Sequence, residues 1–138
     1  MKRNVAFGSV GVAFVVIASA ALAGDKTKSA EAFDRLTSLQ GEWTGQIDGV
    51  NTTLIYALTA NGSALMEQCR PEKGPEMITM FTVDGDHLIA THYCSARNQP
   101  QMATSPITDA QKPLEFSLVR VTGLHDSGVV LPAQGQDR

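Results

Sequence analysis

The chain has 138 residues, a formal net charge of −3 at pH 7 and two cysteines. A chain of this length holds one domain with a single small hydrophobic core, which excludes a two-domain protein. The acidic balance leaves no basic face for a phosphate backbone, so the composition argues against nucleic acid as a partner.

The N-terminal segment, residues 1–23, has the pattern of a signal peptide. It starts with Lys2 and Arg3, continues with an apolar run and ends in Ala-Leu-Ala before Gly24. We therefore expect an exported protein, periplasmic or secreted, that has no membrane partner after cleavage. Removal of the signal leaves 115 residues (138 minus 23) and lowers the charge to −5, since two cations are lost. The alternative is an uncleaved anchor, because the apolar run is nearly long enough to span a membrane.

The next segments predict a flexible lead-in, residues 24–28, and one short helix, residues 29–40. The lead-in is polar and rich in lysine, with nothing apolar to bury. Ser29 is a suitable helix cap, and Gly41 ends the helical pattern. Apolar residues recur every three positions on one helix face: Phe33, Leu36 and Leu39.

After Gly41 the apolar residues alternate, which predicts β-strands joined by tight turns. Three dipeptides favour such turns: Asp48-Gly49, Asn61-Gly62 and Asp84-Gly85. We expect about seven strands: one after Gly41, then 52–59, 63–69, the two arms of a central hairpin (77–94), a weaker run near 102–107, and 114–121. The predicted fold is mainly β, an antiparallel meander that curls into a barrel or sandwich over residues 29–124. Residues 125–138 predict an irregular tail.

Several short motifs carry a resemblance to a known family. They are Gly41-x-Trp43 after the helix, Gly62-Ser63-Ala64-Leu65-Met66-Glu67, Glu76-Met77-Ile78-Thr79-Met80, Asp84-Gly85-Asp86, and Thr91-His92-Tyr93-Cys94 with Asn98-Gln99-Pro100. Together they resemble an uncharacterised family of secreted bacterial calycin-like proteins, the lipocalin and fatty-acid-binding group of β-barrels. The resemblance covers residues 33–124 and implies a barrel fold more firmly than an activity.

The C-terminal side departs from that family. The resemblance implies further strands and another histidine-bearing segment after Gly123-Leu124, and only 14 residues follow. We therefore expect an incomplete calycin-like barrel. Its open sheet edge would favour a homodimer or instability, and a C-terminally truncated copy is a further alternative.

The central hairpin places His92 on the inner face of the sheet. A turn on Asp84-Gly85 or Gly85-Asp86 pairs residues whose numbers have an odd sum, so Thr79, Phe81 and His92 share one face. An inward imidazole could ligate a haem or a metal, or bond a bound small molecule. The alternative is a core histidine satisfied by Glu67, Thr79 or a trapped water.

The cysteines raise two further questions, a metal site and a disulfide. His92 and Cys94 could reach one ion, but only Cys69 and Glu67 are available to complete the set, so no metal site is predicted. The compartment favours a disulfide between Cys69 and Cys94. Geometry opposes it, because one strand lies between them and two strand spacings, about 9.6 Å, exceed the limit of about 7 Å. A late start of that strand, or a bent rim, would allow the bridge.

Trp43 predicts a plug that packs against the helix, or alternatively a ring on which a ligand stacks.

Three functions are consistent with these features. The first is a binding module for a small apolar ligand, with His92, Tyr56, Glu67 and Phe81 as ligand-binding residues. The second is an enzyme that uses His92 as a general base with Glu67 as a second group. The third is a structural or degenerate barrel without a ligand. The sequence predicts no particular cofactor, and no catalytic set emerges from it.

Overall fold

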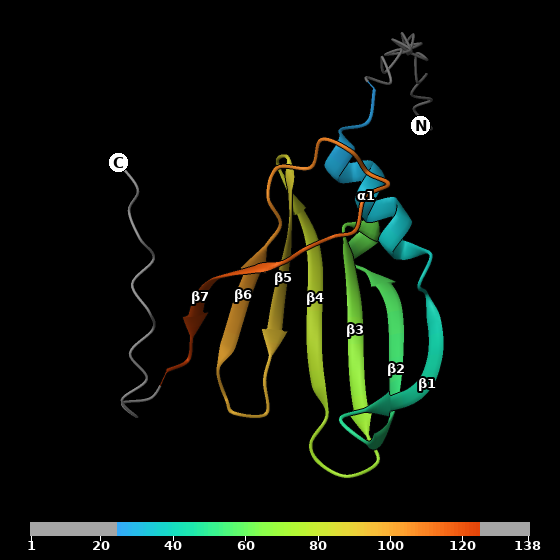
Figure 1. Ribbon diagram of the computed structural model, residues 1–138, viewed down its shortest axis with the longest axis vertical. Coiled ribbons are helices and arrows are strands. Elements are labelled where there is room, and N and C mark those ends of the chain that lie inside the picture. Colours follow the sequence, from blue (N-terminus) through green and yellow to red (C-terminus); the bar gives the residue numbers. More distant parts are fainter. Residues whose placement is uncertain (1–24, 125–138) are drawn as a thin grey trace, which may run out of the picture.

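The computed structural model describes residues 25–124, which form one short helix and a single antiparallel sheet (Figure 1). The predicted signal peptide (1–23) and the predicted tail (125–138) lie outside the described residues. The elements are α1 (Lys28–Thr37), β1 (Gly41–Ile47), β2 (Val50–Thr59), the 3₁₀ turn η1 (Ala60–Gly62), β3 (Ala64–Pro71), β4 (Met77–Asp84), β5 (His87–Tyr93), β6 (Gln99–Ala103) and β7 (Ser117–Thr122).

The seven strands lie in the order of the sequence, from β1 at one edge to β7 at the other. Each pairs with its neighbour in the antiparallel sense. Among residues 25–124, β1 and β7 do not pair with each other, so the curved sheet is not closed into a barrel. The predicted fold, a mainly β meander preceded by one short helix, is confirmed.

The helix begins one residue earlier than predicted and has a different cap. Thr27 is the N-cap, and its side chain accepts a hydrogen bond of 3.2 Å from the backbone N–H of Ala30. Ser29 lies inside the first turn, and its hydroxyl donates instead to the carbonyl of Gly85 at 2.6 Å. The prediction that Ser29 caps the helix was wrong, because its hydroxyl is used to hold α1 against the β4–β5 turn.

The tight turns follow the predicted dipeptides. Asp48 and Gly49 join β1 to β2 with φ angles of 50° and 78°, the left-handed conformation that such a turn requires. Gly85, in the turn between β4 and β5, has a φ of 58°. In that hairpin Asp84 pairs with His87 and Thr79 with His92, so the predicted odd-sum register is confirmed.

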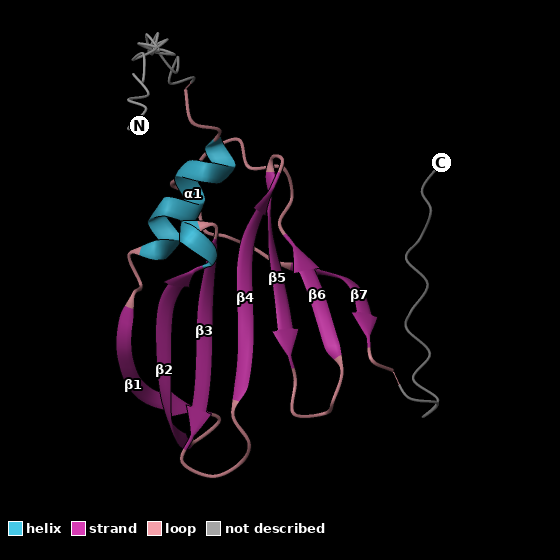
Figure 2. Ribbon diagram, turned by 180° about the vertical axis from the view of Figure 1, so that it is seen from behind, coloured by secondary structure: helices cyan, strands magenta, loops and turns pink. Residues whose placement is uncertain are grey.

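The inner face of the sheet is the face against which α1 packs (Figure 2). Ala32 and Phe33 of the helix contact Leu65 of β3 and Leu88 of β5, which are all buried. These apolar contacts form the core, and they lie at the end of the sheet that the helix covers. The other end of the inner face has no helix over it in the described part of the chain (Figure 1).

The segment 104–116, called here the β6–β7 loop, also crosses this face. It runs from β6 past α1 and back to β7 (Figure 1). Ala110 at its tip is 2% exposed and belongs to the core. The Arg35 guanidinium of α1 donates to the carbonyls of Gln111 and Lys112 at 2.7 and 2.6 Å, so the helix and the loop are fastened together.

The last two strands differ from their predicted bounds. The run near 102–107 was expected to be a strand, but β6 comprises Gln99–Ala103 and the loop begins at Thr104. The side chains of β6 are half-buried along its whole length, which its polar residues did not indicate. The final strand starts at Ser117, because residues 114 to 116 still belong to the loop. The one described helix, α1, is too short and too polar to cross a lipid bilayer.

Candidate functional site

Four polar side chains lie side by side on the inner face, one from each of four neighbouring strands. Tyr56 of β2 pairs with Glu67 of β3, Glu67 with Thr79 of β4, and Thr79 with His92 of β5. We call these four residues the polar row. Because antiparallel partners project to the same side of a sheet, the meander brings residues 36 positions apart into one line.

Hydrogen bonds connect the whole polar row. The Tyr56 hydroxyl donates to Glu67 Oε2, and the Thr79 hydroxyl donates to Glu67 Oε1 at 3.3 Å. The distance between Thr79 Oγ1 and His92 Nδ1 is 3.0 Å. A hydroxyl has a single proton, and that of Thr79 goes to the carboxylate, so His92 Nδ1 carries the proton of its bond to Thr79.

This assignment leaves the other ring nitrogen, Nε2, as an acceptor. A neutral imidazole with its proton on Nδ1 has a lone pair on Nε2. No hydrogen bond joins His92 Nε2 to any of residues 25–124. The His92 side chain is half-buried, while Thr79 beneath it is 7% exposed. The polar row therefore ends in an unfilled acceptor held in a fixed orientation.

The surroundings shift the titration of two groups at the row. Burial raises the pKa of the Tyr56 hydroxyl, and the hydrogen bond to Glu67 and the nearby charge of that carboxylate raise it further. Burial also raises the pKa of the Cys69 thiol, with a smaller contribution from Glu67. Both groups are therefore held in their neutral, protonated forms around a carboxylate.

All four predicted ligand-binding residues lie on the inner face, but they have different surroundings. Tyr56, Glu67 and His92 are members of the polar row. Phe81 lies one register position closer to the helix, opposite Leu65 and Ala90. Its ring packs edge-on against the ring of Phe116, with 5.9 Å between the centroids and 61° between the planes. Phe81 thus contributes a half-buried wall beside the row.

Sequence reasoning did not identify Phe116. The sequence carries a usable signal, since Leu114 and Phe116 alternate at the start of the run that leads into β7, and both pack against the core.

The geometry does not form a direct base and acid pair. His92 and Glu67 are not bonded to each other and are connected only through the Thr79 hydroxyl. Among the described residues, no three side chains of histidine, cysteine, aspartate or glutamate gather closely enough to hold a metal ion.

Both cysteines are free thiols. Met77, the first residue of β4, pairs with Cys69, so β4 does not start late. Cys94 follows the end of β5, on the far side of β4. The strand between them separates the two residues, and the disulfide considered from the compartment is not formed.

Trp43 is not the buried plug that the sequence predicted. It lies on the edge strand β1, and 52% of its surface is exposed. Its indole N–H donates to the carbonyl of Leu39 at 2.7 Å, which fixes the ring beside the end of the helix without covering it. The plug prediction failed because β1 is an edge with no strand or helix over the ring in the described part of the chain.

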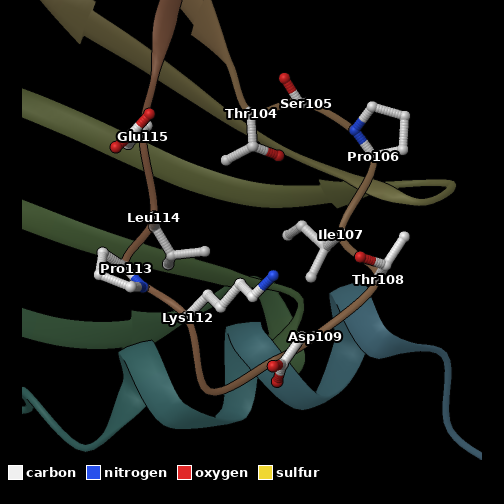
Figure 3. Close-up of a pocket in the computed structure, with 10 residues that line it drawn as sticks. All are labelled: Thr104, Ser105, Pro106, Ile107, Thr108, Asp109, Lys112, Pro113, Leu114 and Glu115. Carbon is white, nitrogen blue, oxygen red and sulfur yellow. The ribbon is translucent and has the colours of Figure 1, made fainter.

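A pocket of about 290 Å³ lies within the β6–β7 loop (Figure 3). Ile107, Lys112 and Leu114 point toward its centre, and residues 104 to 115 supply its wall. Sequence reasoning missed this pocket because the segment was assigned in part to a strand; Pro106 and Pro113 were the signals for a loop. None of the predicted ligand-binding residues lines it.

A second pocket, of about 540 Å³, lies at the far end of β1, β2 and β3. Its lining is polar, and it includes Gln46, Asn51, Arg70 and Glu72. Asn51 is held between two of these side chains: it accepts from Gln46 Nε2 at 3.1 Å and donates to Glu72 Oε2 at 2.9 Å. These side chains already satisfy one another, so the pocket has no free acceptor comparable to His92 Nε2.

Neither a family model, nor a curated protein, nor a solved structure matches the chain. The calycin resemblance stays a prediction made from the motifs.

Proposed function

We propose that the protein binds a small amphipathic molecule on the inner face of the sheet, at the polar row. The observation that carries this proposal is the unfilled acceptor of His92. Thr79 and Glu67 fix the ring with Nε2 as the acceptor, and no residue among 25–124 occupies it. A half-buried acceptor gains most from a partner that brings its own donor.

The chemistry of the row selects the head group of the ligand. Glu67 carries negative charge beside His92, and Nε2 accepts rather than donates. A hydroxyl group would donate to Nε2, whereas a carboxylate would meet a lone pair and a like charge. The ligand head is therefore an alcohol or another neutral donor.

The neighbouring row of the inner face fits an apolar tail. On the side away from the helix-covered core, Leu54 pairs with Cys69 and Cys69 with Met77. All three side chains are half-buried, and methionine adapts readily to an irregular ligand. A short alkyl chain lying across these strands would bury this apolar surface.

The test compares ligands that differ only in the head group. Decan-1-ol, decanoate and decane are titrated into the protein, and the fluorescence of Trp43, the single tryptophan, is followed. The ring lies opposite Leu54, so it reports on this region. We expect saturable binding of decan-1-ol, with decanoate and decane at least tenfold weaker. Equal affinity for all three ligands would overturn the proposal.

Two variants assign the effect to the imidazole. His92→Ala should remove the preference for decan-1-ol over decane, because the acceptor is gone. Thr91→Ala, on the outer face of the same strand, should keep it. An unchanged preference in His92→Ala would show that the acceptor plays no part.

Export is part of the same proposal and has its own readout. Native mass spectrometry of protein collected outside the cytoplasm should give the mass of a chain that starts at Gly24, together with any retained ligand. A mass that includes residues 1–23 would contradict cleavage.

A further inference from the structure

The open edge of β1 is the most exposed backbone in the described chain. All seven residues of β1 are exposed, and one side of the strand pairs with β2 without a bulge, from Gly41 opposite Tyr56 to Ile47 opposite Val50. The other side has no partner strand among residues 25–124. Alternate backbone N–H and C=O groups therefore point away from the sheet.

This edge lacks the features that usually prevent pairing. Protected edges carry proline, a bulge or lysine, or they are very short. The segment Gly41–Ile47 contains no proline or lysine, and its one charged residue is Glu42. The opposite edge, β7, is less suitable, because its register with β6 shifts between Gln101 and Met102 and it carries Arg120.

We propose that two copies of the chain pair through β1, antiparallel, about a twofold axis at Thr44. This register is the one that lets all seven residues of each strand find a partner. Thr44 faces Thr44 of the partner subunit, Trp43 faces the partner's Gly45, and Glu42 faces the partner's Gln46. The two sheets then form one continuous sheet, as in other isologous contacts.

The inner face of the pairing explains the exposed tryptophan. Trp43 and the partner's Gly45 project to the same side of the joined sheet. A Cβ placed on Gly45 would have no neighbouring atom within 4 Å apart from its chain neighbours, so there is room for an aromatic ring above it. An aromatic ring over an edge glycine is a stabilising cross-strand pair. The bond from the indole to Leu39 already orders the ring, which lowers the entropy cost of association.

The outer face is complementary in hydrogen bonding and avoids opposed charges. Thr44 meets the same residue of the partner subunit, a pair that can exchange hydroxyl bonds. Gln46 Nε2 uses one proton on Asn51 and has a second. That second proton can bond the carboxylate of the partner's Glu42. Because the twofold axis repeats this contact, each dimer holds two such pairs.

The test changes the sign of one contact. Gln46→Lys places a cation opposite the partner's Glu42, and Gln46→Glu places a second anion there; both lose the bond to Asn51 equally. Sedimentation velocity over a range of concentrations gives the dimer dissociation constant. Since a cross-strand charge pair contributes about 0.5 kcal/mol and occurs twice, we expect Gln46→Lys to tighten the dimer about fivefold and Gln46→Glu to weaken it about fivefold.

The matched controls are Val119→Lys and Val119→Glu on β7, which should leave the constant unchanged. A second readout is the emission of Trp43, which should move to shorter wavelength as the dimer forms, since the ring is covered. Circular dichroism verifies that each variant keeps the β-sheet. A wild-type chain that stays monomeric at every concentration, equal effects of both Gln46 variants, or a response of the Val119 variants instead would overturn the proposal.

Discussion

The Ser29 hydroxyl of α1 donates a 2.6 Å hydrogen bond to the carbonyl of Gly85, 56 residues further along the chain. Ser29 is fully buried, and Gly85 lies in the turn of the β4–β5 hairpin. This single bond sets where the helix begins to cover the inner face. It therefore decides which part of that face is core and which part stays open beside the polar row.

Ser29→Ala should destabilise the fold by about 1–3 kcal/mol, because it leaves a part-buried carbonyl without its donor. Urea denaturation followed by circular dichroism measures this free energy of unfolding. The matched control is Ser38→Ala, which removes an exposed hydroxyl bond to the Arg35 carbonyl and should change stability by less than about 0.5 kcal/mol. Equal effects of the two changes would show that the Ser29 contact is not a fastening point.

Arg35 should control the opening of the β6–β7 loop. Arg35→Lys keeps the charge but cannot bond the carbonyls of Gln111 and Lys112 together. Hydrogen exchange of the Ile107 amide, which bonds the Asp86 carbonyl at 2.8 Å, should become about tenfold faster through local opening. Amides in β4 of the same sample serve as the internal control. An unchanged rate at Ile107 would mean that the loop is held by its own contacts.

Thr79→Val should disconnect the polar row while keeping its shape. The side chains have nearly the same volume, but valine neither donates to Glu67 nor accepts from His92. We expect a loss of about 1–2 kcal/mol in the free energy of unfolding and weaker binding of decan-1-ol, since the imidazole is no longer oriented. Thr82→Val is the control, because Thr82 lies on the outer face and makes no side-chain hydrogen bond within residues 25–124. Unaltered binding in Thr79→Val would separate ligand binding from the row.

The raised pKa of Tyr56 predicts a loss of stability in alkali. In the unfolded chain a tyrosine loses its proton near pH 10, while the folded protein retains it, so above that pH the unfolded state binds fewer protons. Stability is therefore complete below pH 10 and falls as the pH rises beyond it. The slope stays below about 1.4 kcal/mol per pH unit, because solvent screens a half-buried ring. Tyr56→Phe should show a shallower fall between pH 10 and 11.5 in thermal denaturation, and parallel curves would contradict the effect.

The thiol of Cys69 should react more slowly than an exposed thiol, since its pKa is raised by burial and then by Glu67. Alkylation by iodoacetamide at pH 8, followed by mass spectrometry in a Cys94→Ser background, measures the rate. Glu67→Gln should speed the reaction severalfold, because the carboxylate charge that opposes the thiolate is removed. A slower reaction in Glu67→Gln would contradict this electrostatic account.

Local patterns were sufficient to predict the sheet. Asp84-Gly85 and the alternation on both sides of it determined the hairpin register, and that register placed Thr79 and His92 on one face. These features depend on backbone angles and on the two-residue period of a strand, both of which can be read from the sequence. The membership of Tyr56, Glu67 and His92 in one row follows from the same register, extended over three hairpins.

Contacts between distant segments could not be predicted in the same way. Ser29 looks like a cap in its local sequence, and only the position of Gly85 reveals its role. Ala110 lies in a polar, proline-flanked stretch, yet it is part of the core because the loop folds back over α1. Trp43 was expected to be buried because its size favours burial, but its surroundings depend on whether a closing strand lies beside β1.

The strictly sequential order of the strands also has a kinetic consequence. Each hairpin can form as soon as its own residues have emerged, so the sheet should assemble quickly and progressively from β1 onward. The helix is made first but docks late, because Arg35 must wait for residues 76 and 77 positions downstream. Until then Phe33 has no cover, and a nascent chain halted before the β6–β7 loop would present this greasy helix face to chaperones and proteases.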